Sequence, residues 1–281
     1  MANAVFLTML SISQLFIYPI KSVGGIAVNS AVVTGRGLQN DRRYMLVDMD
    51  GLFLTQRQHP SMALLRTAIE ANELIVWHKD HISEKLRMPL VPEDSLATAT
   101  VKVWDDYCEA QYVSDEADKW FSDKIESPCR LLYMPESTKR KVDPVYALNN
   151  DITSFTDGYP VLLIGQSSLD DLNSRMEEAL PMDRFRPGIV MTGGQAFEED
   201  AMEQFSINGI NFYGVKLCAR CTITTTNQET GVTGKEPLKT LAKYRMANNK
   251  VYFGQNVLCG GKGEIKVGDV ISLIKVKSSF I

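Results

Sequence analysis

Along most of this chain, apolar residues either alternate with polar ones or form short runs, and both patterns are typical of β-strands. In the first half, the pattern predicts strands over residues 15–23, 43–47, 74–77 and 99–104. Asp50-Gly51 separates two apolar triplets there and predicts a hairpin turn. Residues 114–125 differ, because their apolar positions repeat with a helical period after Ser114, a helix-capping residue type.

The second half mixes strand and helix patterns. Strands are predicted over residues 189–192, 205–207, 210–226 and 265–274, with Gly268-Asp269 interrupting the last pair. Helices are predicted over residues 168–180, ended by Pro181, and over residues 236–244, with Pro237 in the first turn. The polar stretch 136–144 is the predicted boundary between two domains, residues 10–135 and 136–281. We therefore expect a strand-rich α+β protein.

The composition limits which binding partners and which cellular compartment we expect for this protein. The 281 residues are 44% hydrophobic and 23% charged, with a formal net charge of −4, so we expect no non-specific nucleic-acid binding. Five scattered cysteines without the spacing of a disulfide framework fit a reducing compartment. The apolar stretch 5–20 has no lysine or arginine before Lys21 and contains polar residues, so we expect no signal peptide, no membrane span and a cytoplasmic protein.

The strongest chemical signal is Cys218-Ala219-Arg220-Cys221, which follows an apolar run. A thiolate beside a cation is the form of cysteine that ligates metals or attacks electrophiles. Half of a zinc site, a thiol–disulfide couple and inert core thiols are the ordinary interpretations. The three histidines lie far away in sequence, the flanking residues favour strand rather than helix, and a guanidinium is costly to bury without a partner.

A second cluster contains cations and a hydroxyl group near predicted strand ends. Lys21 and Ser22 end one strand, and Arg42 and Arg57 lie in nearby predicted hairpins. An ammonium group, a hydroxyl group and guanidinium groups, which donate two parallel hydrogen bonds, together suit the binding of an anion. The alternative is a set of solvated hairpin charges.

A third cluster surrounds Asp157 and Arg186. Asp157 precedes an apolar strand, and Arg186 lies between an aromatic residue and a proline, which suggests a fixed position. Arg186 could equally pair with Asp183 or Glu198. The sequence contains no phosphate-binding loop, because the run 260–263 lacks the earlier glycine and the closing hydroxyl residue.

Taken together, these clusters resemble the MOSC family, which is named after the C-terminal domain of molybdenum cofactor sulfurase. The match is closest to its two-part members, such as the amidoxime-reducing proteins, and covers roughly residues 11–274. It rests on motifs in this order: Tyr-Pro-Ile-Lys-Ser, Asp-Arg, Thr-x-Arg-Gln, Asp-Gly-Tyr-Pro, Leu-Asn-Ser-Arg, Arg-Phe-Arg-Pro, Cys-x-Arg-Cys-x-x-Thr-Thr and Phe-Gly-Gln-Asn. The resemblance implies an N-terminal β-barrel-like domain and a MOSC β-barrel domain with peripheral helices.

In that family the second cysteine of the pair binds molybdenum, which corresponds to Cys221 here. The resemblance implies that the pterin and its phosphate are held by Lys21, Ser22, Arg42, Asp157, Arg186 and Arg220, and approached by Gln255 and Asn256. Two departures each remove a possible polar contact to the cofactor: Ala219 stands where serine is common, and Gly188 where asparagine is common.

The resemblance further implies a molybdenum cofactor-dependent oxidoreductase that reduces small N-hydroxylated substrates. The remaining cysteines lack iron–sulfur spacing, so electrons are expected from a separate ferredoxin- or flavin-type reductase. A carrier of sulfur or cofactor that uses a Cys221 persulfide is the alternative, and a non-catalytic cofactor store is a third hypothesis. The sequence assigns no general acid or base; Asp157 is interpreted as a cofactor contact.

Overall fold

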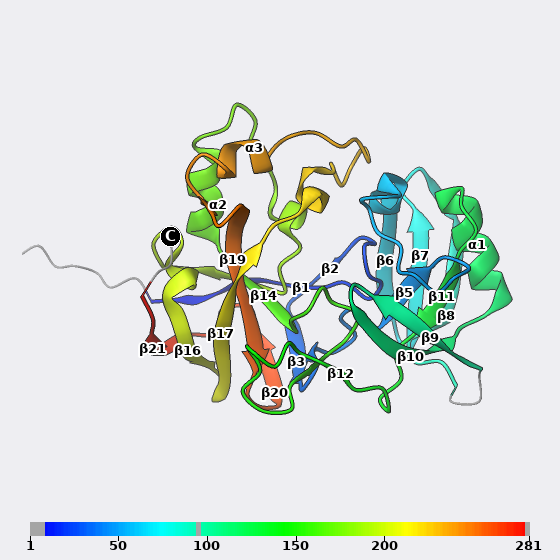
Figure 1. Cartoon of the computed structure of the whole chain (residues 1–281), viewed down its shortest axis with the longest axis horizontal. Coiled ribbons are helices and arrows are strands. Elements are labelled where there is room, and N and C mark those ends of the chain that lie inside the picture. The colour runs from blue at the N-terminus through cyan, green and yellow to red at the C-terminus, as the bar shows by residue number, and fades with distance from the viewer. Residues whose placement is uncertain (1–8, 94–96, 279–281) are drawn as a thin grey trace, which may run out of the picture.

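The computed structural model describes residues 9–93 and 97–278, and its largest element is a nine-stranded sheet (Figure 1). The sheet order is β2-β1-β15-β14-β19-β17-β16-β21, and β18 pairs with β19. The bounds are β1 Ser11–Ile17, β2 Ile26–Val28, β14 Val161–Gly165, β15 Ile189–Thr192, β16 Met202–Ile207, β17 Ile210–Ala219, β18 Met246–Ala247, β19 Lys250–Cys259 and β21 Ile271–Val276. Only the β14–β15 pair among them is parallel.

Smaller sheets account for the other described strands. Four strands follow the order β5-β11-β10-β9: β5 Tyr44–Val47, β9 Thr98–Val103, β10 Asp106–Tyr112 and β11 Arg130–Tyr133. Another sheet holds β6 Leu65–Glu70, β7 Glu73–His78 and β8 His81–Pro89. The remaining two sheets contain β3 Ser30–Thr34, β4 Gly37–Leu38 and β20 Gly263–Lys266, and β12 Arg140–Lys141 with β13 Ile152–Thr153.

The strand-rich α+β class is confirmed. Within the large sheet, the start of β1 and the residue before β21 meet at one point. Ser11 forms a bridge with Val270, and Ile12 exchanges backbone hydrogen bonds with the neighbouring residues 268 and 269. Among the described strands no continuous ladder joins β1 to β21, so the sheet curls without closing into a barrel.

Strands from the first and second halves of the chain share the large sheet and its core. β1 pairs with β15 in the large sheet, and β3 pairs with β20 in a smaller sheet. One apolar core accordingly contains Leu15 from the first half and Phe205 and Phe212 from the second, with the two phenyl rings stacked 5.5 Å apart. Figure 1 shows this sheet beside the second group of strands, β5 to β11 with α1 (Asp115–Ile125). The division at residue 136 stays a prediction.

Helix α1 is confirmed where the sequence placed it. Ser114 has an extended backbone, and its side chain accepts a hydrogen bond from the backbone N–H of Ala117 at 3.1 Å. Ala117, Phe121 and Ile125 form the buried face, as the helical period predicted. Within the described residues, no helix is long and apolar enough to cross a membrane.

The other two helices are shorter than predicted. The helix expected over residues 168–180 is α2, Gln166–Asn173. It ends early because the Asn173 side chain bonds to both the N–H and the C=O of Leu180, which closes a loop instead of another turn. The helix expected over residues 236–244 is reduced to α3, Leu238–Leu241, followed by turns.

Two predicted strands also end early, and both corrections place candidate residues on loops. β1 ends at Ile17 because the N–H of Tyr18 bonds to the Asp41 carboxylate at 2.8 Å instead of to a strand. β17 ends at Ala219, and the threonine run forms the 3-10 helix Thr222–Thr225. Hydroxyl groups of that run bond to backbone carbonyls three residues earlier, which competes with strand pairing.

Candidate functional site

A cavity of about 270 Å³ opens where the C-terminal end of β17 meets loops from both halves of the chain. Five cationic side chains and one carboxylate line it: Lys21, Arg42, Arg186, Lys216, Arg220 and Asp157. The whole chain carries a formal charge of −4, so this excess of positive charge is local. Such a cavity attracts anions.

Lys21 and Asp157 form an ion pair at the cavity. Lys21 Nζ lies 2.6 Å from Asp157 Oδ1 and also donates to the carbonyl of Phe155 at 2.9 Å. Burial lowers the pKa of Lys21, against the opposing effect of Asp157. Burial alone would raise the pKa of Asp157, but Lys21 and the Trp104 indole N–H outweigh it, so that pKa lies below its usual range. Asp157 is therefore ionised at neutral pH.

Two guanidinium groups lie over one buried tyrosine ring. The Cζ atoms of Arg42 and Arg186 are each 4.2 Å from the centroid of Tyr18. Arg42 Nη1 donates to both carboxylate oxygens of Asp41 at 2.7 Å, and Nη2 donates to the carbonyl of Arg186 at 3.2 Å. Burial, with repulsion from Arg42, lowers the pKa of Arg186 to about 10. Stacking and the buried Asp41 carboxylate thus hold two like charges at one ring.

Three cavity residues have a backbone conformation that non-glycine residues rarely adopt. The φ angles of Ser22, Arg42 and Arg186 are 64°, 48° and 55°. For a residue other than glycine, this left-handed conformation is less stable than the right-handed one by roughly 1–2 kcal/mol. Such strain concentrates at functional sites, where the surrounding structure enforces it. All three side chains line the same cavity.

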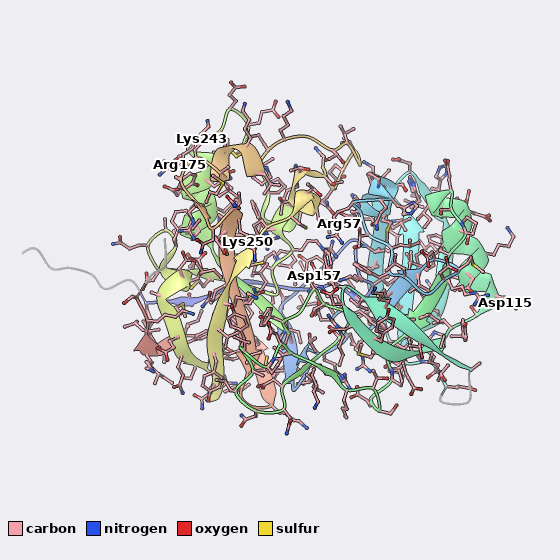
Figure 2. All side chains as sticks on the ribbon, viewed as in Figure 1. Arg57, Asp115, Asp157, Arg175, Lys243 and Lys250 are labelled. Atoms are coloured by element: carbon pink, nitrogen blue, oxygen red, sulfur yellow. The ribbon has the colours of Figure 1, made fainter. Side chains whose placement is uncertain are left out.

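Each cysteine of the pair has its own arginine. Cys221 Sγ accepts from Arg57 Nη1 at 3.6 Å, and Cys218 Sγ accepts from Arg220 Nη1 at 3.0 Å. Burial raises the pKa of Cys218, and Arg220 opposes that effect. Both thiols are half-buried, so neither is an inert core group. Figure 2 shows Arg57 and Asp157 between the nine-stranded sheet and the strands β5 to β11.

The structure brings most of the predicted site residues together. Eight of the ten line the cavity: Lys21, Ser22, Arg42, Asp157, Arg186, Arg220, Cys221 and Asn256. Arg57 is not in the wall but reaches the Cys221 thiol. Gln255 does not reach the cavity, because successive residues of β19 face opposite sides. Its side chain is fully buried, and neither polar atom has a partner among the described residues.

Sequence reasoning missed Tyr18 as the ring under two arginines, and it missed Lys216. Lys216 lies in β17 and lines the cavity, with its Nζ 4.2 Å from the centroid of Tyr146 and 5.6 Å from that of Tyr159. The signal was present as the single charged residue of a mostly apolar run, residues 210–217. Tyr18 gave no comparable signal, because a tyrosine before a proline is typical of many turns.

The unpartnered N–H donors of the cavity suit an anionic cofactor, and any metal there would take most of its ligands from that cofactor. Arg186 Nη2 and Arg220 Nε are buried N–H donors without a partner among the described residues. Buried donors of this kind need an acceptor. No group of three or more His, Cys, Asp or Glu side chains within the described ranges could hold a metal ion. A metal at Cys221 would therefore need ligands from a bound cofactor.

Comparison with known proteins gives two family matches and several relatives. Residues 9–128 match the MOSC N-terminal beta barrel domain, and residues 150–272 match the MOSC domain. Human mitochondrial amidoxime reducing component 2 is 32% identical, over 93% of this chain and 82% of that protein. Mouse mitochondrial amidoxime-reducing component 1 is 30% identical over 94% and 82%. Rice molybdenum cofactor sulfurase is 31% identical over 86% of this chain but only 32% of its own length.

The cytoplasmic location of this protein stays a prediction.

Proposed function

This chain belongs to the MOSC family, and on that basis we propose that it is an oxidoreductase that reduces small N-hydroxylated compounds with a bound molybdenum cofactor. The relatives named as amidoxime-reducing components support this class of reaction. One observation carries the proposal: the half-buried Cys221 thiol borders a cavity with a strong excess of positive charge.

In this proposal Cys221 is the one protein ligand of the metal. A thiolate is a soft ligand and suits a metal already held by sulfur atoms of its cofactor. The anionic part of the cofactor would be held by the clamp residues, which are Lys21, Ser22, Arg42, Arg186 and Arg220. When bound, the cofactor supplies two-electron oxidation and reduction at its metal.

The overall reaction fixes what the protein must provide. An amidoxime, two electrons and two protons give an amidine and one water, so the N–O bond breaks and oxygen leaves as water. A separate reductase, for which we propose the ferredoxin or flavin type, supplies the electrons. Asp157 is ionised at neutral pH and bound to Lys21, so its part is to hold that lysine and not to donate a proton.

Metal content and turnover together test this function. Protein purified from a host that makes the cofactor should contain about one molybdenum per chain and should reduce benzamidoxime with a viologen dye as electron donor. Cys221→Ser should lose both signals, and Cys218→Ser serves as the matched control with a milder loss. Retention of both signals by Cys221→Ser would reject the metal ligand, and absence of molybdenum from the native protein would reject the enzyme.

A sulfur carrier is the second candidate, because rice molybdenum cofactor sulfurase is also a relative and the Cys221 thiol is accessible beside Arg57. In that case a separate sulfurtransferase would supply sulfane sulfur to form a Cys221 persulfide, whose outer sulfur would pass to an acceptor and regenerate the Cys221 thiol. Intact-mass analysis of freshly purified protein separates the two. An added sulfur on Cys221 without bound molybdenum favours the carrier, and molybdenum with an unmodified thiol favours the reductase.

A further inference from the structure

Lys216 is one of three cations of the cavity wall, with Arg186 and Arg220, that form no ion pair with a carboxylate of the described residues. Its ammonium group lies over the rings of Tyr146 and Tyr159, and no acidic side chain of residues 9–93 or 97–278 forms an ion pair with it. Lys21, by contrast, is paired with Asp157, and Arg42 with Asp41. An ammonium held only by aromatic faces keeps its hydrogen-bond donors available.

Two further donors beside Lys216 are also unused. Asn256 is the cross-strand partner of Lys216 on β19, and its amide, which lines the same cavity, bonds to no other described residue. The Tyr159 hydroxyl is buried without a partner among the described residues. Burial raises the pKa of Tyr159, so this phenol stays protonated and can donate. An ammonium, an amide and a phenol therefore gather on one stretch of the wall.

This stretch is separate from the part of the clamp around Arg42 and Arg186. The charges that act on Arg186 come from Arg42, Asp41 and Asp157, together with the Tyr18 phenol, whereas Lys216 contacts Tyr146 and Tyr159. The Tyr159 phenol lies within electrostatic range of the Cys218 thiol, so the stretch adjoins the cysteine pair. One phosphate carries a charge of about −1.5 to −2. Five cations less the two paired carboxylates, Asp157 and Asp41, leave a net charge of +3, which exceeds that of one phosphate and leaves positive charge for a second anion.

We propose that Lys216, Asn256 and Tyr159 form a carboxylate subsite that selects N-hydroxylated substrates bearing an anionic group. A carboxylate has two oxygens that accept several hydrogen bonds, which suits three unused donors from neighbouring residues of one cavity wall. An ion pair inside a cavity is screened less by water and salt than one on the surface. The subsite rests on the proposed reductase function and specifies its substrate class.

A matched pair of substrates tests the subsite in the cofactor-loaded enzyme. Benzamidoxime and its para-carboxylate differ in one anionic group. In the native enzyme, kcat/KM for the carboxylate should be about tenfold higher, which corresponds to about 1.4 kcal/mol. Lys216→Met should bring the ratio of the two kcat/KM values close to one, and Lys216→Arg should restore most of it. Lys250→Met is the matched control, because Lys250 is exposed at the start of β19 outside the cavity (Figure 2).

Three results would overturn the subsite. The first is equal kcat/KM for the two compounds in the native enzyme, and the second is an unchanged ratio in Lys216→Met. The third is a loss of molybdenum from Lys216→Met, which would show that this lysine holds the cofactor instead. If neither compound is reduced, the proposed reaction fails, and calorimetric binding of the para-carboxylate decides the subsite separately. Binding about tenfold weaker in Lys216→Met supports it, and equal binding rejects it.

Discussion

Glu199 offers a direct test of how burial shapes this fold. Its carboxylate is fully buried and accepts hydrogen bonds from the backbone N–H of Gly165 at 3.0 Å and the hydroxyl of Ser168 at 2.8 Å. These bonds tie the end of β14 to the first turn of α2. No lysine or arginine among the described residues pairs with it. Burial therefore raises the pKa of Glu199 from 4.5 to about 7, despite both hydrogen bonds.

The raised pKa makes the fold less stable as pH rises. Below about pH 4.5 the carboxyl group is protonated in the folded and unfolded chains alike, and the full stability is present. Between that pH and about 7 the unfolded chain ionises first, so the free energy of unfolding falls and then levels off. At roughly 1.4 kcal/mol for each pH unit between the two pKa values, the full loss is about 3 kcal/mol.

Glu199→Gln should remove this loss, because a glutamine stays neutral and can still bond to Gly165 and Ser168. Urea unfolding at several pH values gives the free energy of unfolding of both proteins. From about pH 5 to about pH 8, the native protein should lose about 2–3 kcal/mol relative to the variant. Glu198→Gln, one residue away and only half-buried, is the control and should follow the native protein. A difference that stays constant with pH would refute the reasoning.

Other substitutions test the clamp and the thiol. Gly25→Ala would place a methyl group 2.4 Å from Tyr18 Cε1. We therefore expect the free energy of unfolding, measured with urea, to fall by about 1–3 kcal/mol, and the protein to bind less molybdenum. Unchanged values of both would contradict this packing. Ser22→Gly should be more stable than Ser22→Ala by about 1 kcal/mol, because φ is 64°; equal midpoints would mean that the turn is unstrained. Arg57→Met should lower the molybdenum content of protein from a cofactor-competent host, because Arg57 Nη1 lies 3.6 Å from Cys221 Sγ and orients that sulfur. An unchanged molybdenum content would count against this role of the contact.

The sequence was informative where a local rule sets the structure. Ser114 and the apolar period after it predicted α1, because capping and amphipathic spacing act within a few residues. The β-branched threonine run after Cys221 misled, because its side chains bond to nearby carbonyls once the partner strand has ended. Strand pairing depends on distant segments, so a propensity alone could not locate that end.

In the candidate site, too, local sequence features could be predicted, and features that depend on distant segments could not. Lys21, Arg42 and Arg186 could be selected because the motifs that contain them resemble the MOSC family; from charge alone, solvated hairpin residues stayed the alternative. The sequence could not tell that Asn256 faces the cavity and Gln255 the opposite side, since alternation along a strand fixes the faces only after one of them is known. The role of Tyr18 required knowing that two distant arginines meet over its ring.

The register of one strand pair controls the geometry of the clamp. Leu15 of β1 lies opposite Ile189 of β15, and the N–H of Phe16 bonds to the carbonyl of Gly188 at 3.0 Å. This register places Tyr18, just after β1, beside Arg186, just before β15. A shift of two residues would keep every side chain on its face but move the ring by about 6–7 Å along the strand, at about 3.3 Å per residue. The anion clamp therefore depends on a pairing between the two halves of the chain, and neither half can form it alone.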